Sequence, residues 1–243
     1  MLVSLLAIAL HAAAQEPALA VAELPNAAQT TIAGTFVVRP LGNSSYAVTD
    51  TLEARSNVLA LLNGPNVGAK VSLAHSDSLH VAATAHLQGG WDLHTWAASA
   101  RLGSTFSSAG GNHLSLVLSP AIGRYRTLTT LSDGTVTPTY FGQAAMGFTV
   151  DDTVALTERS AVRLWVYTDA VPLAQGVLFL TAGANWAHAF GPYFHASVGV
   201  GALVGTGSGN AIESFRDALV QAEVTMPDTP VLPYPDLRLW WTF

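Results

Sequence analysis

The feature that most constrains this chain is an alternation of apolar and polar residues with a period of two, which begins near residue 30. From Phe194 to Ala202 every second residue is apolar, and the residues between them are His, Ser or Gly. The same alternation recurs in residues 78–88, 95–106 and 112–123. Because a period of two places successive side chains on opposite faces of a strand, it predicts an all-β chain whose strands have one apolar and one polar face.

The connections between these strands are alternately short and long. Short turns rich in turn-forming residues are predicted at residues 49–51, 76–78, 108–112, 151–152 and 191–192. Longer connections are predicted at residues 63–66, 88–93, 127–137, 169–175 and 206–233. Short turns at one rim and longer loops at the other are typical of a transmembrane antiparallel up-and-down β-barrel. Counting predicts about 12 strands (10–12), with residues 31–41 and 44–49 as an opening hairpin.

Composition indicates which face points outward. Half of the residues are hydrophobic and 11% are charged, whereas soluble domains have roughly 25% charged residues. A soluble β-sandwich is the alternative fold, and it would expose charged residues on its outer face. Here the apolar face carries almost no charge, with Glu158 as an exception. Since no run of about 18 apolar residues is present either, we predict a barrel with its apolar face toward lipid and its polar face toward the lumen.

Charge and cysteine content exclude several classes of function. The net charge is −6, Lys70 is the one lysine, and no basic run is present, which argues against a nucleic-acid partner. The absence of cysteine rules out disulfides, thiol catalysis, thiolate metal sites and a lipid-modified N-terminal cysteine.

The first residues predict export. Residues 1–14 form a short apolar stretch that ends in small residues and resembles a cleavable signal peptide. The stretch has no basic residue, since the first one is Arg39, and a buried N-terminal helix is the alternative. Residues 15–29 are rich in Ala and Pro and predict a periplasmic leader. Residues 30–243 would then form the barrel, with residues 206–234 as a long extracellular loop.

The last strand carries a family resemblance. Leu239, Trp241 and the terminal Phe243 share one face of an alternating segment, which resembles the C-terminal signature of Gram-negative outer-membrane β-barrel proteins. Residues 46–53 are similar to a strand–turn–strand segment that recurs in bacterial barrels. The resemblance implies a bacterial outer membrane, with its bilayer and lipopolysaccharide leaflet as partners, and recognition of these three residues by the outer-membrane assembly machinery. Barrels of very different function share these features, so no activity is implied.

Extending the alternation predicts which charged side chains face the lumen. These lumen-lining candidates are Arg39, Glu53, Arg55, Lys70, Arg101, Arg159, Arg163 and Arg238, together with Asp236. A net acidic chain would therefore have a basic interior, which favours a small passive channel or transport-type barrel for a small anionic solute. The alternative is structural, because networks of Arg and acidic residues can brace the walls and leave no continuous path.

The longest loop predicts a short amphipathic helix. Asn210 and Glu213 have the spacing of a capping box, and Ile212, Phe215 and Leu219 follow at helical spacing. Such a helix could serve as a gate over the pore mouth or could rest on the rim.

Two further classes of function stay open: an adhesion or structural barrel that acts through its loops, and a lipid-modifying or proteolytic barrel enzyme. The chain has no Gly-x-Ser-x-Gly or His-Glu-x-x-His motif. His80 and His86 lie about 20 Å apart on one strand, too far to share a metal ion. His113 and Ser115 share a face, as expected of any polar strand face, and no acid accompanies them. The sequence therefore predicts no catalytic residue, no metal site and no cofactor.

Overall fold

A computed structural model describes residues 24, 26–40, 42–108, 110–130, 134–170, 178–205 and 231–243. The predicted signal peptide and the gate-helix residues Ile212, Phe215 and Leu219 lie outside these ranges.

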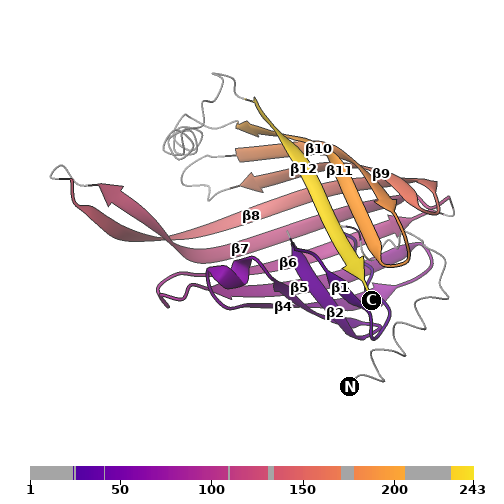
Figure 1. The fold of residues 1–243 in the computed structure, drawn as a ribbon, viewed down its shortest axis with the longest axis horizontal. Coiled ribbons are helices and arrows are strands. Elements are labelled where there is room, and N and C mark those ends of the chain that lie inside the picture. The colour runs from indigo at the N-terminus through magenta and orange to yellow at the C-terminus, as the bar shows by residue number, and fades with distance from the viewer. Residues whose placement is uncertain are drawn as a thin grey trace.

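Twelve antiparallel strands close into a barrel in which each strand pairs with its neighbours in sequence and β1 pairs with β12 (Figure 1). The strands are β1 (Phe36–Val38), β2 (Asn43–Thr49), β3 (Leu52–Asn57), β4 (Asn66–His75), β5 (Leu79–Gly89), β6 (Trp96–Ser107), β7 (His113–Thr130), β8 (Val136–Thr157), β9 (Ser160–Ala170), β10 (Leu178–Ala189), β11 (Phe194–Gly205) and β12 (Val231–Thr242). The all-β class, the up-and-down barrel and the number of strands are confirmed.

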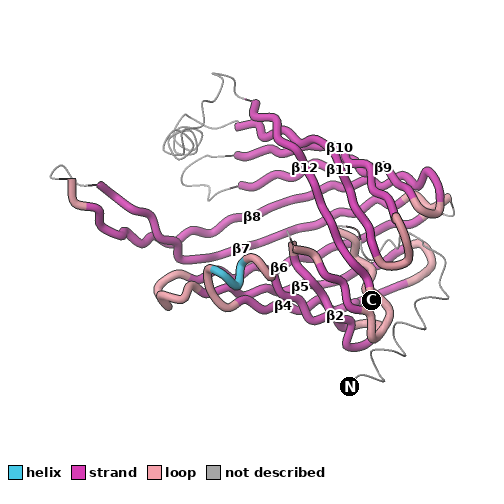
Figure 2. Tube along the Cα trace, viewed as in Figure 1, coloured by secondary structure: helices cyan, strands magenta, loops and turns pink. Residues whose placement is uncertain are grey.

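Helix is nearly absent from the described ranges. As Figure 2 shows, it is confined to one 3-10 turn, Ala60–Leu62, in the connection between β3 and β4. No helix within these ranges is long and apolar enough to cross a membrane.

One predicted turn is wrong. The turn expected at Asp151 and Asp152 does not form, because β8 continues to Thr157 and the chain turns at Glu158 and Arg159. Asp151 points into the barrel, where Arg163 pairs with its carboxylate. Its charge is therefore part of an ion pair in the interior and does not face solvent in a turn. Because the turn lies at Glu158 and Arg159, Glu158 is exposed in this turn and does not lie on the apolar face of a strand.

The two faces of the strands have opposite chemistry. Large apolar side chains are exposed on the outside, among them Leu87 at 58% and Val200 at 67% exposure. The buried inward side chains include Thr105, Ser115 and Thr149. This is the reverse of a soluble domain, in which apolar side chains gather inside.

The wall of the barrel is uneven in height. β7 and β8 have 18 and 22 residues, and their loop-side ends project from the barrel as a two-stranded hairpin (Figure 1). β1, β2 and β3 have only 3, 7 and 6 residues. The wall is therefore lowest beside the seam at which β1 meets β12.

Candidate functional site in the barrel interior

The barrel encloses a cavity of about 560 Å³, a volume within the usual range for small-molecule sites. Inward-facing residues of β2 to β10 and of β12 form its wall. Six cationic side chains line it: Arg39, Arg55, Lys70, Arg101, Arg163 and Arg238.

The other two lumen candidates lie elsewhere. Glu53 is buried inside the barrel at 1% exposure, next to the cavity. Arg159 is exposed in the turn between β8 and β9 and does not line the cavity. Sequence reasoning missed Asp151, although the alternation could have revealed it, because Gly147, Thr149 and Thr153 lie on the same face of β8.

Three of the arginines are held by acids. Arg55 Nη2 lies 2.8 Å from Glu53 Oε2, within the same strand. Arg163 Nε donates to Asp151 Oδ2 at 2.7 Å, across the β8–β9 pair. Arg238 donates from Nε and Nη2 to the two carboxylate oxygens of Asp236, each at 3.0 Å. Such charge-assisted hydrogen bonds hold the paired side chains in one geometry. These three pairs therefore brace the barrel wall, as expected if the charged interior has a structural role.

The other three cations have a different environment. Arg39 Nη1 donates to the backbone oxygen of Asn43 at 3.0 Å. Lys70 binds backbone oxygens, as described below, and no carboxylate of the described residues pairs with Arg101. Among the described residues, the six cations that line the cavity outnumber the three carboxylates that form ion pairs with them.

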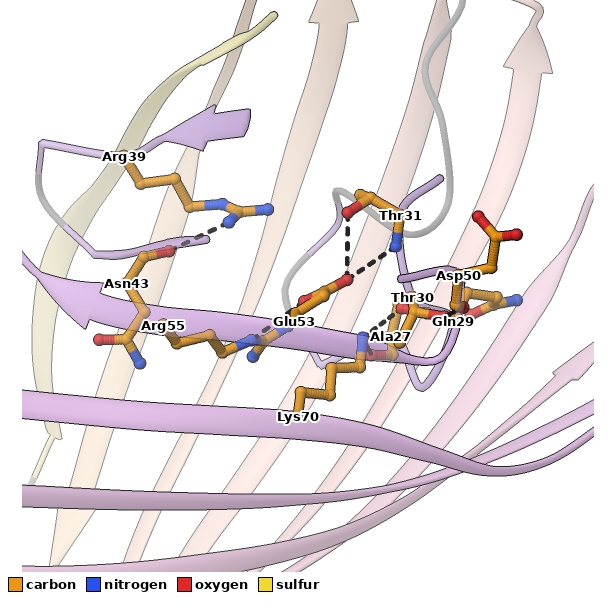
Figure 3. Close-up of polar contacts among 10 residues, drawn as sticks. All are labelled: Ala27, Gln29, Thr30, Thr31, Arg39, Asn43, Asp50, Glu53, Arg55 and Lys70. Atoms are coloured by element: carbon orange, nitrogen blue, oxygen red, sulfur yellow. Dashed lines mark hydrogen bonds and ion pairs between the residues drawn. The ribbon is translucent and has the colours of Figure 1, made fainter. Parts of the chain in front are cut away.

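A stretch of chain crosses the interior. We call residues 26–31 the inner segment; most of them belong to the predicted leader. Figure 3 shows that wall residues bind its backbone. The Thr31 amide donates to Glu53 Oε1 at 2.7 Å, and Lys70 Nζ donates to the oxygens of Ala27, at 3.0 Å, and Gln29.

Further contacts continue across the barrel. The Ala28 amide donates to Thr105 Oγ1 at 2.8 Å, and Asn26 Nδ2 donates to Asp151 Oδ2 at 2.9 Å. Just ahead of the segment, Leu24 is buried in a cluster with Val37, Ala187 and Trp240. The segment thus contacts β3, β4, β6 and β8, and Leu24 reaches β1, β10 and β12.

The inner segment lies at the turn end of the barrel. Thr30 Oγ1 donates to the backbone oxygen of Asp50 in the β2–β3 turn, and the Ala33 amide donates to the Asp50 carboxylate at 2.8 Å. Leu24, Asn26, Ala27 and Ala28 also line the cavity. The segment therefore forms the floor of the cavity.

Two serine–histidine pairs bear on the enzyme alternative. Ser160 Oγ lies 2.7 Å from His188 Nδ1, and Ser107 Oγ lies 2.9 Å from His113 Nδ1. Neither histidine pairs with a carboxylate of the described residues, and His188 packs between Trp186 and Phe190. A nucleophile, a base and an acid therefore do not converge in the described ranges. Nor do these ranges contain a group of three His, Asp or Glu that could hold a metal ion.

Comparison with protein-family models, with curated proteins and with solved structures found no match. Function is therefore inferred from the barrel, its two faces and its interior.

Proposed function

We propose that this chain is an integral β-barrel of a bacterial outer membrane. The observation that supports this proposal is the apolar exterior, on which Val67, Leu118 and Val198 are 62%, 43% and 55% exposed. Exposing apolar surface to water costs about 25 cal/mol per Å², and a bilayer removes that cost. β4 to β6 and β9 to β12 have 10 to 12 residues each, close to the roughly 9–11 residues that a tilted strand needs to span the hydrocarbon core.

Refolding tests this location. The full chain, refolded with phosphatidylcholine vesicles, is expected to float with them and to migrate faster on gels when it is not boiled. Folding into a soluble monomer without lipid or detergent would contradict the proposal.

Within that membrane, we infer a narrow passage that favours small anions. The supporting observation is that six cationic side chains line the cavity, whereas ion pairs between described residues involve three of them. Fixed positive charges in a confined aqueous space raise the local anion concentration and repel cations. The solute would be a small anion that enters from the loop side.

The inner segment would close this passage at the turn end. It is held by backbone hydrogen bonds to Glu53, Lys70 and Thr105, which a displaced segment could exchange for water. Conduction would therefore require the segment to move.

Planar-bilayer recording tests the passage. We expect rare, small conductance events from the full chain and larger, frequent ones from a variant that lacks residues 1–29, with heat-modifiable migration as the control for folding. If the full chain, this variant and a variant that lacks residues 206–230 all fold but none conducts, the passage is excluded.

A further inference from the structure

One row of inward-facing residues crosses four neighbouring strands and carries two aromatic rings. Trp165 of β9 lies in register with Gly183 of β10. Gly183 pairs in turn with Gly201 of β11, and Gly201 pairs with Tyr234 of β12. We call these four residues the aromatic row. A Cβ on Gly183 would lie 2.6 Å from Trp165 Cζ2, and one on Gly201 would lie 2.5 Å from Tyr234 Cζ. Each ring therefore occupies the space that a side chain on the adjacent glycine would need.

The two rings of the aromatic row face the cavity. Trp165 and Tyr234 both line it. The indole is held in one orientation, because Trp165 Nε1 donates to Asn185 Oδ1 at 2.7 Å. A fixed aromatic ring offers a second ring an offset-stacked or edge-to-face contact. The aromatic row therefore provides a surface for a planar ring in a ligand.

A second row of inward-facing residues lies on the other side of the barrel. Lys70 of β4 is in register with Thr84 of β5, and Thr84 is in register with Arg101 of β6. All three residues line the cavity, and we call them the cationic row. In a closed barrel of twelve strands, β4, β5 and β6 lie opposite β10, β11 and β12 (Figure 1). The cationic row therefore faces the aromatic row across the cavity.

The two rows lie at a similar depth in the barrel. Thr84 is at the middle of β5, and Arg101 is near the middle of β6. On the other side, Trp165 is at the middle of β9, and Gly183 is near the middle of β10. A small ligand in the cavity can therefore contact both rows at once.

The cations on the two sides differ in their partners. On the aromatic side, ion pairs with Asp151 and Asp236 hold the cavity-lining arginines of β9 and β12. On the cationic side, Arg101 forms no ion pair with a carboxylate of the described residues. Because a guanidinium presents a planar fork of N–H donors that matches a carboxylate, Arg101 is suited to bind the acid group of a ligand.

We propose that the cavity binds a small aromatic carboxylate of the benzoate class. Its carboxylate accepts hydrogen bonds from Arg101, and its ring packs against Trp165 and Tyr234. An anion without a ring would gain nothing from the aromatic row, and an uncharged ring would gain nothing from Arg101. This proposal rests on the small-anion interior proposed above and names the class of anion. It does not depend on whether the anion crosses the barrel.

Fluorine NMR tests this binding. The full chain is refolded in detergent micelles and para-fluorobenzoate is added in increasing amounts, with protein-free micelles as the control for partition into detergent. We expect saturable line broadening that benzoate reverses and that acetate and benzyl alcohol do not. An absence of saturable broadening, or equal displacement by acetate or by benzyl alcohol, would overturn the proposal.

Two matched pairs of variants assign the two contacts. Arg101→Gln is expected to weaken the affinity about tenfold, because it removes a charge-assisted contact, whereas Arg159→Gln in an exposed turn should leave it unchanged. Trp165→Leu is expected to weaken the affinity about fivefold through the lost ring contact. Trp91→Leu, in the exposed connection between β5 and β6, should leave it unchanged. Equal affinities within either pair would contradict the assigned contact.

Heat-modifiable migration reports whether each variant folds. If Trp165→Leu does not fold, Tyr234→Leu tests the aromatic row in its place, with the same expected loss of affinity. Saturable binding of para-fluorobenzoate to a chain that never conducts would refute the passage alone. Conduction of chloride without such binding would refute the aromatic carboxylate site alone.

Discussion

Buried charges that bind backbone are the distinctive feature at the residue scale. Glu53 and Lys70 face each other in register on β3 and β4 and are 1% and 2% exposed. Burying a charge is costly unless hydrogen bonds satisfy it. Glu53 accepts from the Thr31 amide in addition to its ion pair with Arg55, and Lys70 donates to the backbone oxygens of Ala27 and Gln29. Glu53 and Lys70 therefore hold the inner segment in place at the floor of the cavity.

Lys70→Met tests whether Lys70 holds the inner segment in place. The substitution keeps the aliphatic stem and removes the ammonium that binds two backbone oxygens, so the free energy of unfolding should fall by about 1.5–3 kcal/mol. Urea titration in micelles measures the change, and limited proteolysis should cut near residue 27 in the variant first. Arg101→Met, which removes a cavity cation with no carboxylate partner in the described ranges, should have a smaller effect. Equal losses in the two variants would mean that Lys70 does not hold the segment.

A second residue-scale prediction concerns glycine on the inner wall. A Cβ at Gly199 would lie 2.0 Å from the backbone oxygen of Ala184 on β10, and backbone cannot rotate away as a side chain can. Gly199→Ala should therefore cost at least about 1–3 kcal/mol and reduce the fraction of heat-modifiable protein after refolding. Gly191→Ala in the β10–β11 turn meets nothing within 4 Å and serves as the control. Equal refolding yields would contradict the predicted clash.

At the scale of elements, the strands were predictable and the inner segment was not. The alternation is visible because each strand has two different environments, one on each face. The inner segment is held in large part through backbone groups, such as the Ala28 amide and the Ala27 oxygen, which almost any sequence supplies. The turn predicted at Asp151 is wrong because aspartate favours turns but can also pair with a cation inside a barrel, as Asp151 does with Arg163.

The last strand has two separable roles. Phe243 closes the seam through its backbone, while its ring is 48% exposed and stacks on Tyr193. Phe243→Ala should therefore refold into vesicles normally, because the backbone pair remains. In cells, by contrast, recovery in the outer membrane should fall several-fold if the assembly machinery recognises Leu239, Trp241 and Phe243.

Phe190→Ala is the matched control for this variant, because it removes an exposed ring in the β10–β11 turn at the same rim. Equal recovery of the two variants from cells would show that the terminal ring is not part of an assembly signal.

At the scale of the whole molecule, the net charge of −6 hides a separation of charge. Of the residues that the structure describes, six cations line the cavity and three acids pair with them. Several acids lie in exposed connections instead: Asp50, Asp77, Asp92 and Glu158. Half of the residues are hydrophobic, and large apolar side chains are exposed on the outward faces of the strands. Within the described ranges, a cationic interior thus lies inside an apolar wall.

The reversal potential in a tenfold KCl gradient tests this cationic interior most directly. It is recorded with the variant that lacks residues 1–29, in which most of the inner segment is absent from the cavity. We predict a potential with the sign of anion selectivity, reduced or inverted by Arg101→Glu and unchanged by Arg159→Glu. Cation selectivity in the parent variant, or an equal response to the two substitutions, would contradict it.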